Sequence, residues 1–94
     1  MKYFVYLIIN ISKDKSISYV GYTNNLDKRL FLHNSSKGAK FTRGRKWTLI
    51  YKKEYKSKSR ALIEEYKLKK NYKLRSIIKL NYIKKNENFN STTL

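Results

Sequence analysis

The sequence predicts a small α+β domain in which a β-sheet is covered by helices, in the order ββαβαα. Runs of β-branched and aromatic residues occur near the start of the chain and again around residue 50. Segments with apolar residues at helical spacing follow these runs. The 94 residues are sufficient for one domain, which we expect to cover residues 1–85.

The first two strands are predicted from two apolar, β-rich runs, Tyr3 to Ile9 and Ile17 to Tyr22. The polar segment Ser12 to Ser16 lies between them and has the composition of a turn. Two such runs joined by a short polar segment predict an antiparallel hairpin.

A first helix is predicted from about Asn25 to Asn34. Thr23 or Asn24 can cap it, and Asp27 lies in its first turn, near the positive end of the helix dipole. A loop over residues 35–45 follows.

The remaining elements are a strand and two helices. The strand is expected at Trp47 to Tyr55. A helix beginning at Ser57 or Ser59 is expected to run to about residue 71, and another to cover about residues 73–84. Residues 86–94 are polar and are predicted to form a flexible tail.

The charge balance points to a polyanionic partner. Lys and Arg number 23 against six Asp and Glu, which gives a net charge of +17. An AT-rich genome and a need for solubility are alternative explanations, although +17 exceeds what solubility requires. A ribosomal or nucleoid-type protein would share this charge, so charge favours nucleic acid as the partner without identifying an activity.

Composition also excludes several classes of protein. There is no cysteine, and with a single histidine a structural zinc site is close to excluded. The longest apolar run, Phe4 to Ile9, is too short to span a membrane. We expect a soluble protein of a reducing compartment, cytoplasmic and nucleoid-associated if the source is bacterial.

Glu65 is the carboxylate that most needs an explanation. On a helical projection of this segment, Glu65 lies near the centre of a stripe of apolar and aromatic residues, whereas Glu64 lies about 100° away, toward the polar side. A carboxylate in a packed face is costly unless it is paired, protonated or bound to metal. An ion pair with Arg29 or Lys69 is the structural alternative. The stripe is Ala61, Leu62, Tyr66, Leu68 and Tyr72.

The first predicted helix shows a similar pattern. Leu26, Arg29, Leu30 and His33 lie on one side of it. His33 could be a core histidine and Arg29 could extend to solvent. If both helices face the same sheet, Arg29, His33 and Glu65 could converge on one shallow site.

Two tyrosines of the hairpin are further candidates. Tyr6 shares a strand face with Phe4 and Ile8, and Tyr19 shares one with Gly21. Gly21 leaves a gap in the sheet surface, which often marks close approach by a ligand or another backbone. A purely structural role for both tyrosines is equally consistent with their preference for strands.

This set of residues fits phosphodiester chemistry with one metal ion. Six acidic residues can hardly supply a two-metal site, so Glu65 would be the sole protein ligand of Mg²⁺ or Mn²⁺. Arg29 would stabilise charge on the phosphate and a tyrosine would activate water. The sequence contains no Walker-type loop and no G-x-G-x-x-G.

The loop over residues 35–45 predicts contacts with nucleic acid. Its basic residues flank Phe41, an aromatic that could stack on a base. An ordinary solvent-exposed loop without a binding role is an equal alternative. The predicted nucleic-acid-binding residues are Lys37, Lys40, Arg43, Arg45 and Lys69.

Taken in order, these motifs resemble the GIY-YIG nuclease superfamily, and most closely its small single-domain bacterial branch. The resemblance covers about residues 3–80 and rests on the ordered set rather than on any one element. Phe4 stands where the motif has glycine, and Val5 and Val20 stand where it has isoleucine. The matching segments are Phe4-Val5-Tyr6, Tyr19-Val20-Gly21-Tyr22-Thr23-Asn24, Arg29 followed by His33, and Ala61-Leu62 with Glu65.

The resemblance implies a three-stranded antiparallel sheet flanked by helices, and a role for each site residue. Tyr6 and Tyr19 match the two motif tyrosines, one a general base and the other a positioning group, in an order left open. Arg29 matches the arginine on the scissile phosphate, His33 a histidine that supports the phosphate or leaving group, and Glu65 the metal-binding glutamate.

The predicted function is a metal-dependent endonuclease that hydrolyses phosphodiester bonds in DNA, by structure-specific or repair-type nicking. Two alternatives stay open: a non-catalytic nucleic-acid-binding module, and a nuclease domain that needs a partner protein to deliver its substrate. No membrane partner is expected.

Overall fold

The computed structural model describes residues 1–12 and 15–93, with side chains through residue 86, and its elements follow the predicted order. A 3-10 helix of one turn, which has no periodic signal in the sequence, lies in the loop before the third strand. Residues 13 and 14 of the predicted turn lie outside the described residues. The elements are β1 (Tyr3–Ser12), β2 (Lys15–Thr23), α1 (Leu26–Asn34), η1 (Lys40–Thr42), β3 (Thr48–Tyr55), α2 (Lys58–Lys70) and α3 (Tyr72–Thr93).

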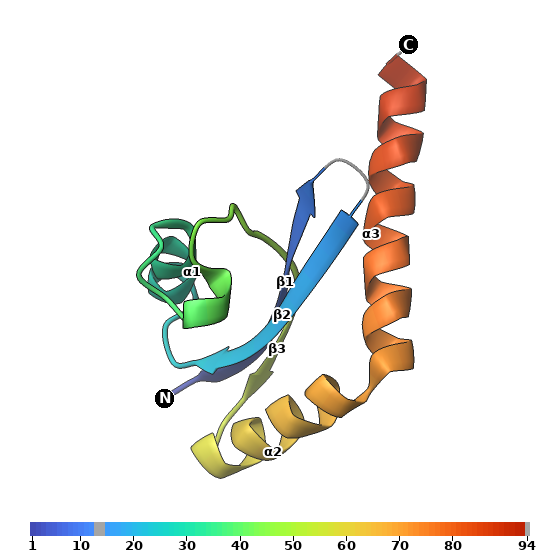
Figure 1. The fold of residues 1–94 in the computed structure, drawn as a ribbon. Coiled ribbons are helices and arrows are strands. Elements are labelled where there is room, and N and C mark those ends of the chain that lie inside the picture. Colours follow the sequence, from blue (N-terminus) through green and yellow to red (C-terminus); the bar gives the residue numbers. More distant parts are fainter. Residues whose placement is uncertain (13–14, 94) are drawn as a thin grey trace.

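The sheet is antiparallel and three-stranded, with β1 in the centre and the order β2-β1-β3. The five residues from Val5 to Ile9 are all buried, because other elements cover both faces of this central strand (Figure 1). This burial explains why the run is continuously apolar instead of alternating. The β1–β2 hairpin and the α+β class are thereby confirmed.

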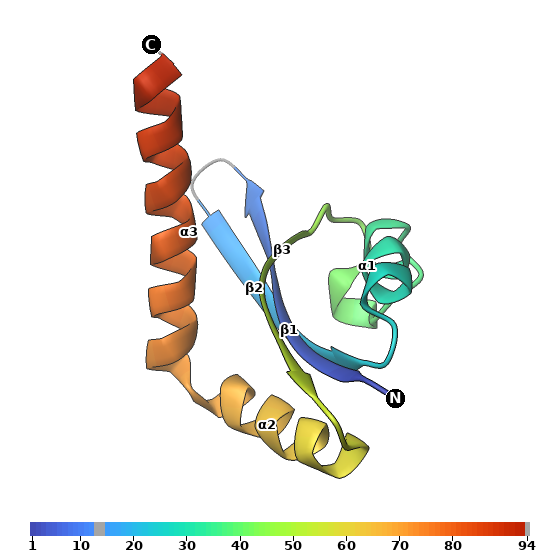
Figure 2. The same ribbon diagram turned by 180° about the vertical axis from the view of Figure 1, so that it is seen from behind.

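The helices divide between the two faces of the sheet. In both views α1 lies on one side, and α2 and α3 lie on the other (Figures 1 and 2). The face toward α1 carries Tyr6 and Ile8, which pack with Trp47, Leu26 and Leu30. The face toward α2 and α3 carries Val5 and Leu7, which pack with Val20, Ala61 and Leu68. The two helices that carry predicted site residues, α1 and α2, therefore pack on opposite faces of the sheet.

The buried face of α2 differs from the predicted stripe. Ala61 and Leu68 are buried as expected, but Leu62, Tyr66 and Tyr72 are 41%, 62% and 72% exposed. The face toward the sheet runs through residues 61, 64, 65 and 68, at spacing i, i+3, i+4 and i+7. Both glutamates lie on this face, with side chains 20% and 19% exposed.

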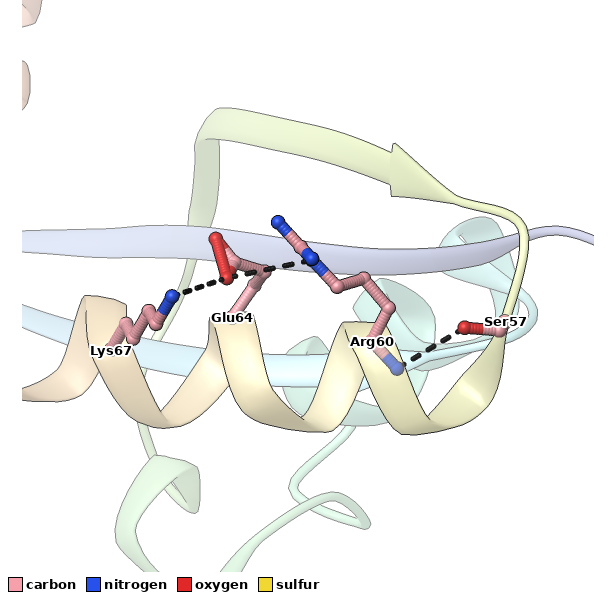
Figure 3. Close-up of polar contacts among 4 residues, drawn as sticks. All are labelled: Ser57, Arg60, Glu64 and Lys67. Atoms are coloured by element: carbon pink, nitrogen blue, oxygen red, sulfur yellow. Dashed lines mark hydrogen bonds and ion pairs between the residues drawn. The ribbon is translucent and has the colours of Figure 1, made fainter.

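Glu64 is thus as buried as Glu65, and the predicted difference between them is wrong. Ion pairs with Arg60 at 3.7 Å and Lys67 at 3.2 Å hold the Glu64 carboxylate on this face (Figure 3). Such pairing offsets the cost of removing a carboxylate from water. Apolar periodicity alone could not detect a helix face built partly from paired charges.

Side-chain caps begin the helices. Asn25, rather than the predicted Thr23 or Asn24, caps α1 and accepts from the Lys28 backbone N–H at 3.2 Å. Thr23 supports this turn by accepting from the Asn25 N–H at 3.1 Å. Ser57 caps α2 as predicted and accepts from the Arg60 N–H at 3.2 Å (Figure 3).

Helix α3 is longer than predicted. It continues to Thr93 and so includes most of the segment 86–94, for which a tail outside the helix was expected. Within the described part of the chain, no helix is both long and apolar enough to cross a membrane.

Candidate active site

The side chain of Tyr6 lies across Gly21 of the neighbouring strand. The two residues are directly paired in the β1–β2 register, and a Cβ at position 21 would overlap the Tyr6 hydroxyl and ring. The gap predicted at Gly21 is therefore filled by a tyrosine side chain, not by a ligand or another backbone. Glycine at this position allows Tyr6 to lie flat against the sheet, with only 1% of its surface exposed.

We predict that Gly21→Ala destabilises the fold by about 1–3 kcal/mol, because the added methyl group overpacks the Tyr6 ring. Urea unfolding of Gly21→Ala, Tyr6→Leu and the double variant tests this. The alanine should cost less when Tyr6 is already replaced. An equal cost in both backgrounds would show that the Tyr6 contact is not the cause.

A chain of buried hydrogen bonds begins at the Tyr6 hydroxyl. Tyr6 Oη lies 2.7 Å from His33 Nε2, and His33 Nδ1 lies 2.9 Å from Thr42 Oγ1. The Thr42 hydroxyl donates to the Ala39 carbonyl at 2.8 Å, so it accepts from His33 Nδ1–H. His33 Nε2 then carries the lone pair and accepts from Tyr6 O–H. The three side chains therefore have one consistent arrangement of protons.

Burial sets the protonation of this chain. Burial, with a smaller effect from the Arg29 charge, lowers the pKa of His33 to about 4. Burial also raises the pKa of Tyr6 to about 12, and Arg29 partly opposes this effect. At neutral pH, His33 is thus a neutral acceptor and Tyr6 a neutral donor.

The lowered pKa of His33 predicts a pH-dependent stability. Its folded pKa of about 4 lies below the ordinary 6.5, so between these values the unfolded chain binds a proton that the folded chain excludes. The contribution of His33 to the free energy of unfolding is fully present above pH 6.5. It falls by roughly 1 to 3 kcal/mol as the pH drops toward 4.

Urea unfolding between pH 7 and pH 4 measures this loss. The same measurement on a His33→Gln variant gives the loss caused by the carboxylates, which is then subtracted. Because the chain has one histidine, its ring-proton NMR signal reports the titration directly. A histidine that titrates near 6.5 in the folded protein would contradict the buried arrangement.

Tyr19 and Arg29 lie above this buried chain and are both half-buried. The Tyr19 ring meets the His33 ring edge-on at 5.2 Å between centroids. Interaction with the Tyr6 side chain raises the pKa of Arg29, and Tyr19 adds to this effect. The structure therefore brings Tyr6, Tyr19, Arg29 and His33 together, whereas the convergence expected from the sequence was of Arg29, His33 and Glu65.

Glu65 lies on α2, on the other side of the sheet, and its carboxylate pairs with Lys69 Nζ at 3.7 Å. Burial is the main cause of the raised pKa of Tyr6, and the charge of Glu65 makes the smallest contribution to it. The pairing with Lys69 is one of the two ion pairs considered from the sequence.

The donor set at this site fits a hard cation held by one carboxylate. Both ring nitrogens of His33 are engaged in hydrogen bonds and the residue is fully buried, so it is not available as a ligand. Among the described residues, no group of three His, Cys, Asp or Glu side chains could hold a metal ion. The single Glu65 carboxylate fits Mg²⁺, which retains several waters and binds phosphate oxygens.

The loop between α1 and β3 is more ordered than a solvated connection. Trp47 Nε1 donates to the Thr42 carbonyl at 2.9 Å, and the Asn34 side chain bonds the Trp47 backbone N–H at 2.6 Å and carbonyl at 3.1 Å. Gly38 lies so close to His33 that a Cβ there would be 2.6 Å from Nδ1. This loop therefore fixes the His33 ring in position.

The predicted basic residues of this loop are all at the surface. Phe41 is 53% exposed and stacks on Tyr19 at 6.1 Å between ring centroids. Thr42 supports the site and was not among the predicted site residues. The exposed basic residues are Lys37, Lys40, Arg43 and Arg45, and Lys69 of α2 is exposed as well.

The chain is a small basic α+β domain in which two tyrosines, an arginine and a histidine surround one buried chain of hydrogen bonds. Residues 2–88 match the model of the GIY-YIG catalytic domain, and this chain therefore belongs to the GIY-YIG family. The family is one of endonucleases that act on nucleic acid, generally with a divalent metal.

Several bacterial proteins are similar to this chain. A UPF0213 protein of Oceanobacillus iheyensis is 48% identical over 65 residues, which cover 68% of this chain and 74% of the relative. A UPF0213 protein of Clostridium perfringens is 46% identical over 66 residues, 69% of this chain and 70% of the relative. The solution NMR structure of a UPF0213 protein from Bacillus halodurans covers 85% of each chain with 35% identity and a TM-score of 0.47.

Proposed function

We propose that this protein is an endonuclease that hydrolyses phosphodiester bonds in DNA, by a one-metal mechanism and in structure-specific or repair-type nicking. The observation that carries the proposal is the Tyr6–His33–Thr42 chain of hydrogen bonds. It gives the Tyr6 proton a defined acceptor, the neutral His33 Nε2 at 2.7 Å. A tyrosine that donates to a histidine in this way can accept a proton from water while it passes its own proton to the histidine.

The proposed reaction is a direct hydrolysis. A water oxygen bonds to phosphorus, one phosphorus–oxygen bond of the backbone breaks, and the water proton goes to Tyr6 Oη. The Tyr6 proton goes to His33 Nε2, and the leaving oxygen takes a proton from solvent. After the bond breaks, His33 returns its proton to Tyr6 Oη, which releases one to solvent, so that both residues regain their starting state. This relay avoids a free tyrosinate, which the pKa of about 12 would make scarce at neutral pH.

The other site residues hold the phosphate. Arg29 stabilises the charge that develops on the phosphate oxygens, and Tyr19 positions the phosphate or the water. Glu65 would hold Mg²⁺ or Mn²⁺, which supplies charge neutralisation at the phosphate when bound. The exposed Lys37, Lys40 and neighbouring arginines of the loop add sequence-independent contacts to the DNA backbone.

A cleavage assay tests the proposal. Labelled plasmid, single-stranded, flap and four-way-junction DNA are incubated with the protein in Mg²⁺, in Mn²⁺ and in EDTA, at a low and stated salt concentration. Cuts that need the metal are expected. Binding without cleavage under every condition would contradict catalysis by the chain alone, and would favour a binding module or a domain that needs a partner protein.

A further inference from the structure

A cavity of about 260 Å³ opens along the exposed edge of β2, beside the candidate active site. Tyr19 belongs to both the cavity and the site, and Lys69 of the cavity wall pairs with Glu65. The wall combines an aromatic side from β2 and the loop with a cationic side from α2 and α3. Its residues are Ser18, Tyr19, Val20, Phe41, Lys69 and Arg75.

The aromatic side is rigid although it is exposed. The Phe41 ring lies nearly parallel to Tyr19, at an interplanar angle of 20°, and also contacts Trp47 at 6.3 Å between centroids. Trp47 is buried and Tyr19 is braced by His33. Phe41 nevertheless keeps 53% of its surface exposed, so it offers a fixed apolar face to a ligand.

The cationic side is held at the corner between α2 and α3. Arg75 Nε donates to the Leu68 carbonyl at 3.1 Å, and one of its terminal nitrogens donates to the Lys69 carbonyl at 3.2 Å. These bonds use two of the five guanidinium N–H donors. The Lys69 side chain is 51% exposed. Two positive charges therefore lie across the cavity from an aromatic ring.

We propose that this cavity binds an unpaired nucleotide next to the scissile phosphate, an inference that rests on the proposed function. The base stacks on Phe41, and its phosphate is bound by Lys69 and Arg75. Inside a duplex the flat faces of a base are covered by its neighbours, so only an unstacked base can present one to Phe41. The preferred substrate class is thus DNA with an unpaired nucleotide at a flap, fork, bulge or branch.

Binding of DNA that carries the fluorescent base 2-aminopurine tests the inference. The base is placed in a single-nucleotide bulge, and a fully paired duplex of the same sequence serves as reference, both in EDTA. The wild-type protein is compared with Phe41→Ala and Phe41→Trp. Phe31→Ala is the matched control, because Phe31 is 66% exposed on α1 and lies outside the cavity.

We expect the wild-type protein to quench the bulged base and to bind the bulge more tightly than the duplex. Phe41→Ala should weaken bulge binding roughly tenfold with little effect on the duplex, and tryptophan should restore it. Phe31→Ala should change neither. Equal affinity for both DNAs, or an equal loss on both in Phe41→Ala, would overturn the inference.

Cleavage of the same two DNAs in Mg²⁺ separates this inference from the proposed function. Cleavage without preference for the unpaired nucleotide would overturn the cavity assignment alone. A Phe41-dependent preference in binding, with no cleavage of either DNA, would support the cavity assignment and contradict the nuclease.

Discussion

Replacement of Glu65 by glutamine is expected to lower metal-dependent cleavage by about a hundredfold or more. Glutamine has the same size and shape as glutamate, so the helix face toward the sheet is preserved, but the charge that would hold the cation is lost. DNA binding in EDTA should be retained, because it depends on exposed Lys and Arg side chains and the substitution removes a negative charge. Cleavage rates and binding constants measured on one flap substrate provide the test.

Glu64→Gln is the matched control for this experiment. Glu64 is the adjacent residue, lies on the same helix face and has a side chain 20% exposed against 19% for Glu65. Its partners are Arg60 and Lys67, whereas Glu65 pairs with Lys69 (Figure 3). We expect a small loss of stability and an unchanged cleavage rate. Equal losses of activity in the two variants, or wild-type cleavage by Glu65→Gln, would remove Glu65 from the mechanism.

The comparison of these two glutamates shows what could be predicted from the sequence and what could not. Strand and helix positions follow from local composition, and their order was predicted correctly. The rotation of α2 about its axis was not, because Glu64 is held on the buried face by ion pairs with Arg60 and Lys67. Hydrophobic periodicity assigns such a residue to the polar side, and only tertiary contacts reverse that assignment.

The features of the candidate site also divide into those that the sequence indicated and those that it did not. Arg29, His33 and Tyr6 were noted as candidates from their positions, and only the resemblance to the GIY-YIG superfamily gave them roles. Thr42 was missed because a single threonine in a basic loop has no pattern that indicates a buried hydrogen bond to a histidine 9 residues away. The close approach of Gly38 to His33 could not be predicted, because it depends on how the loop folds back.

The spacing on α1 also could not show how the histidine works. From the sequence, His33 was either a core residue or a phosphate-contacting group. In the structure it is fully buried and bonded at both nitrogens, so any effect on the phosphate must pass through Tyr6. Under the proposed mechanism, burial and function are therefore compatible for this residue, because a buried neutral imidazole can accept the Tyr6 proton.

The Tyr6–His33 bond leads to a prediction about which tyrosine is the general base. Tyr6→Phe keeps the ring that lies across Gly21 but removes the proton relay, and we expect cleavage to fall by about 10²–10⁴-fold. Tyr19→Phe keeps the stacking on Phe41 and lacks only a positioning hydroxyl, so its loss should be smaller. Single-turnover cleavage rates at saturating protein compare the two variants without any contribution from binding.

Stability must be measured alongside these rates, because Tyr6→Phe leaves the buried His33 Nε2 without its donor. That loss should cost about 1–3 kcal/mol of folding free energy, whereas Tyr19→Phe should cost less. Assays well below the unfolding midpoint of both variants separate catalysis from unfolding. If Tyr19→Phe were the slower enzyme while both variants stayed folded, Tyr19 would be the base, and the buried chain would serve only to hold Tyr6 against the sheet.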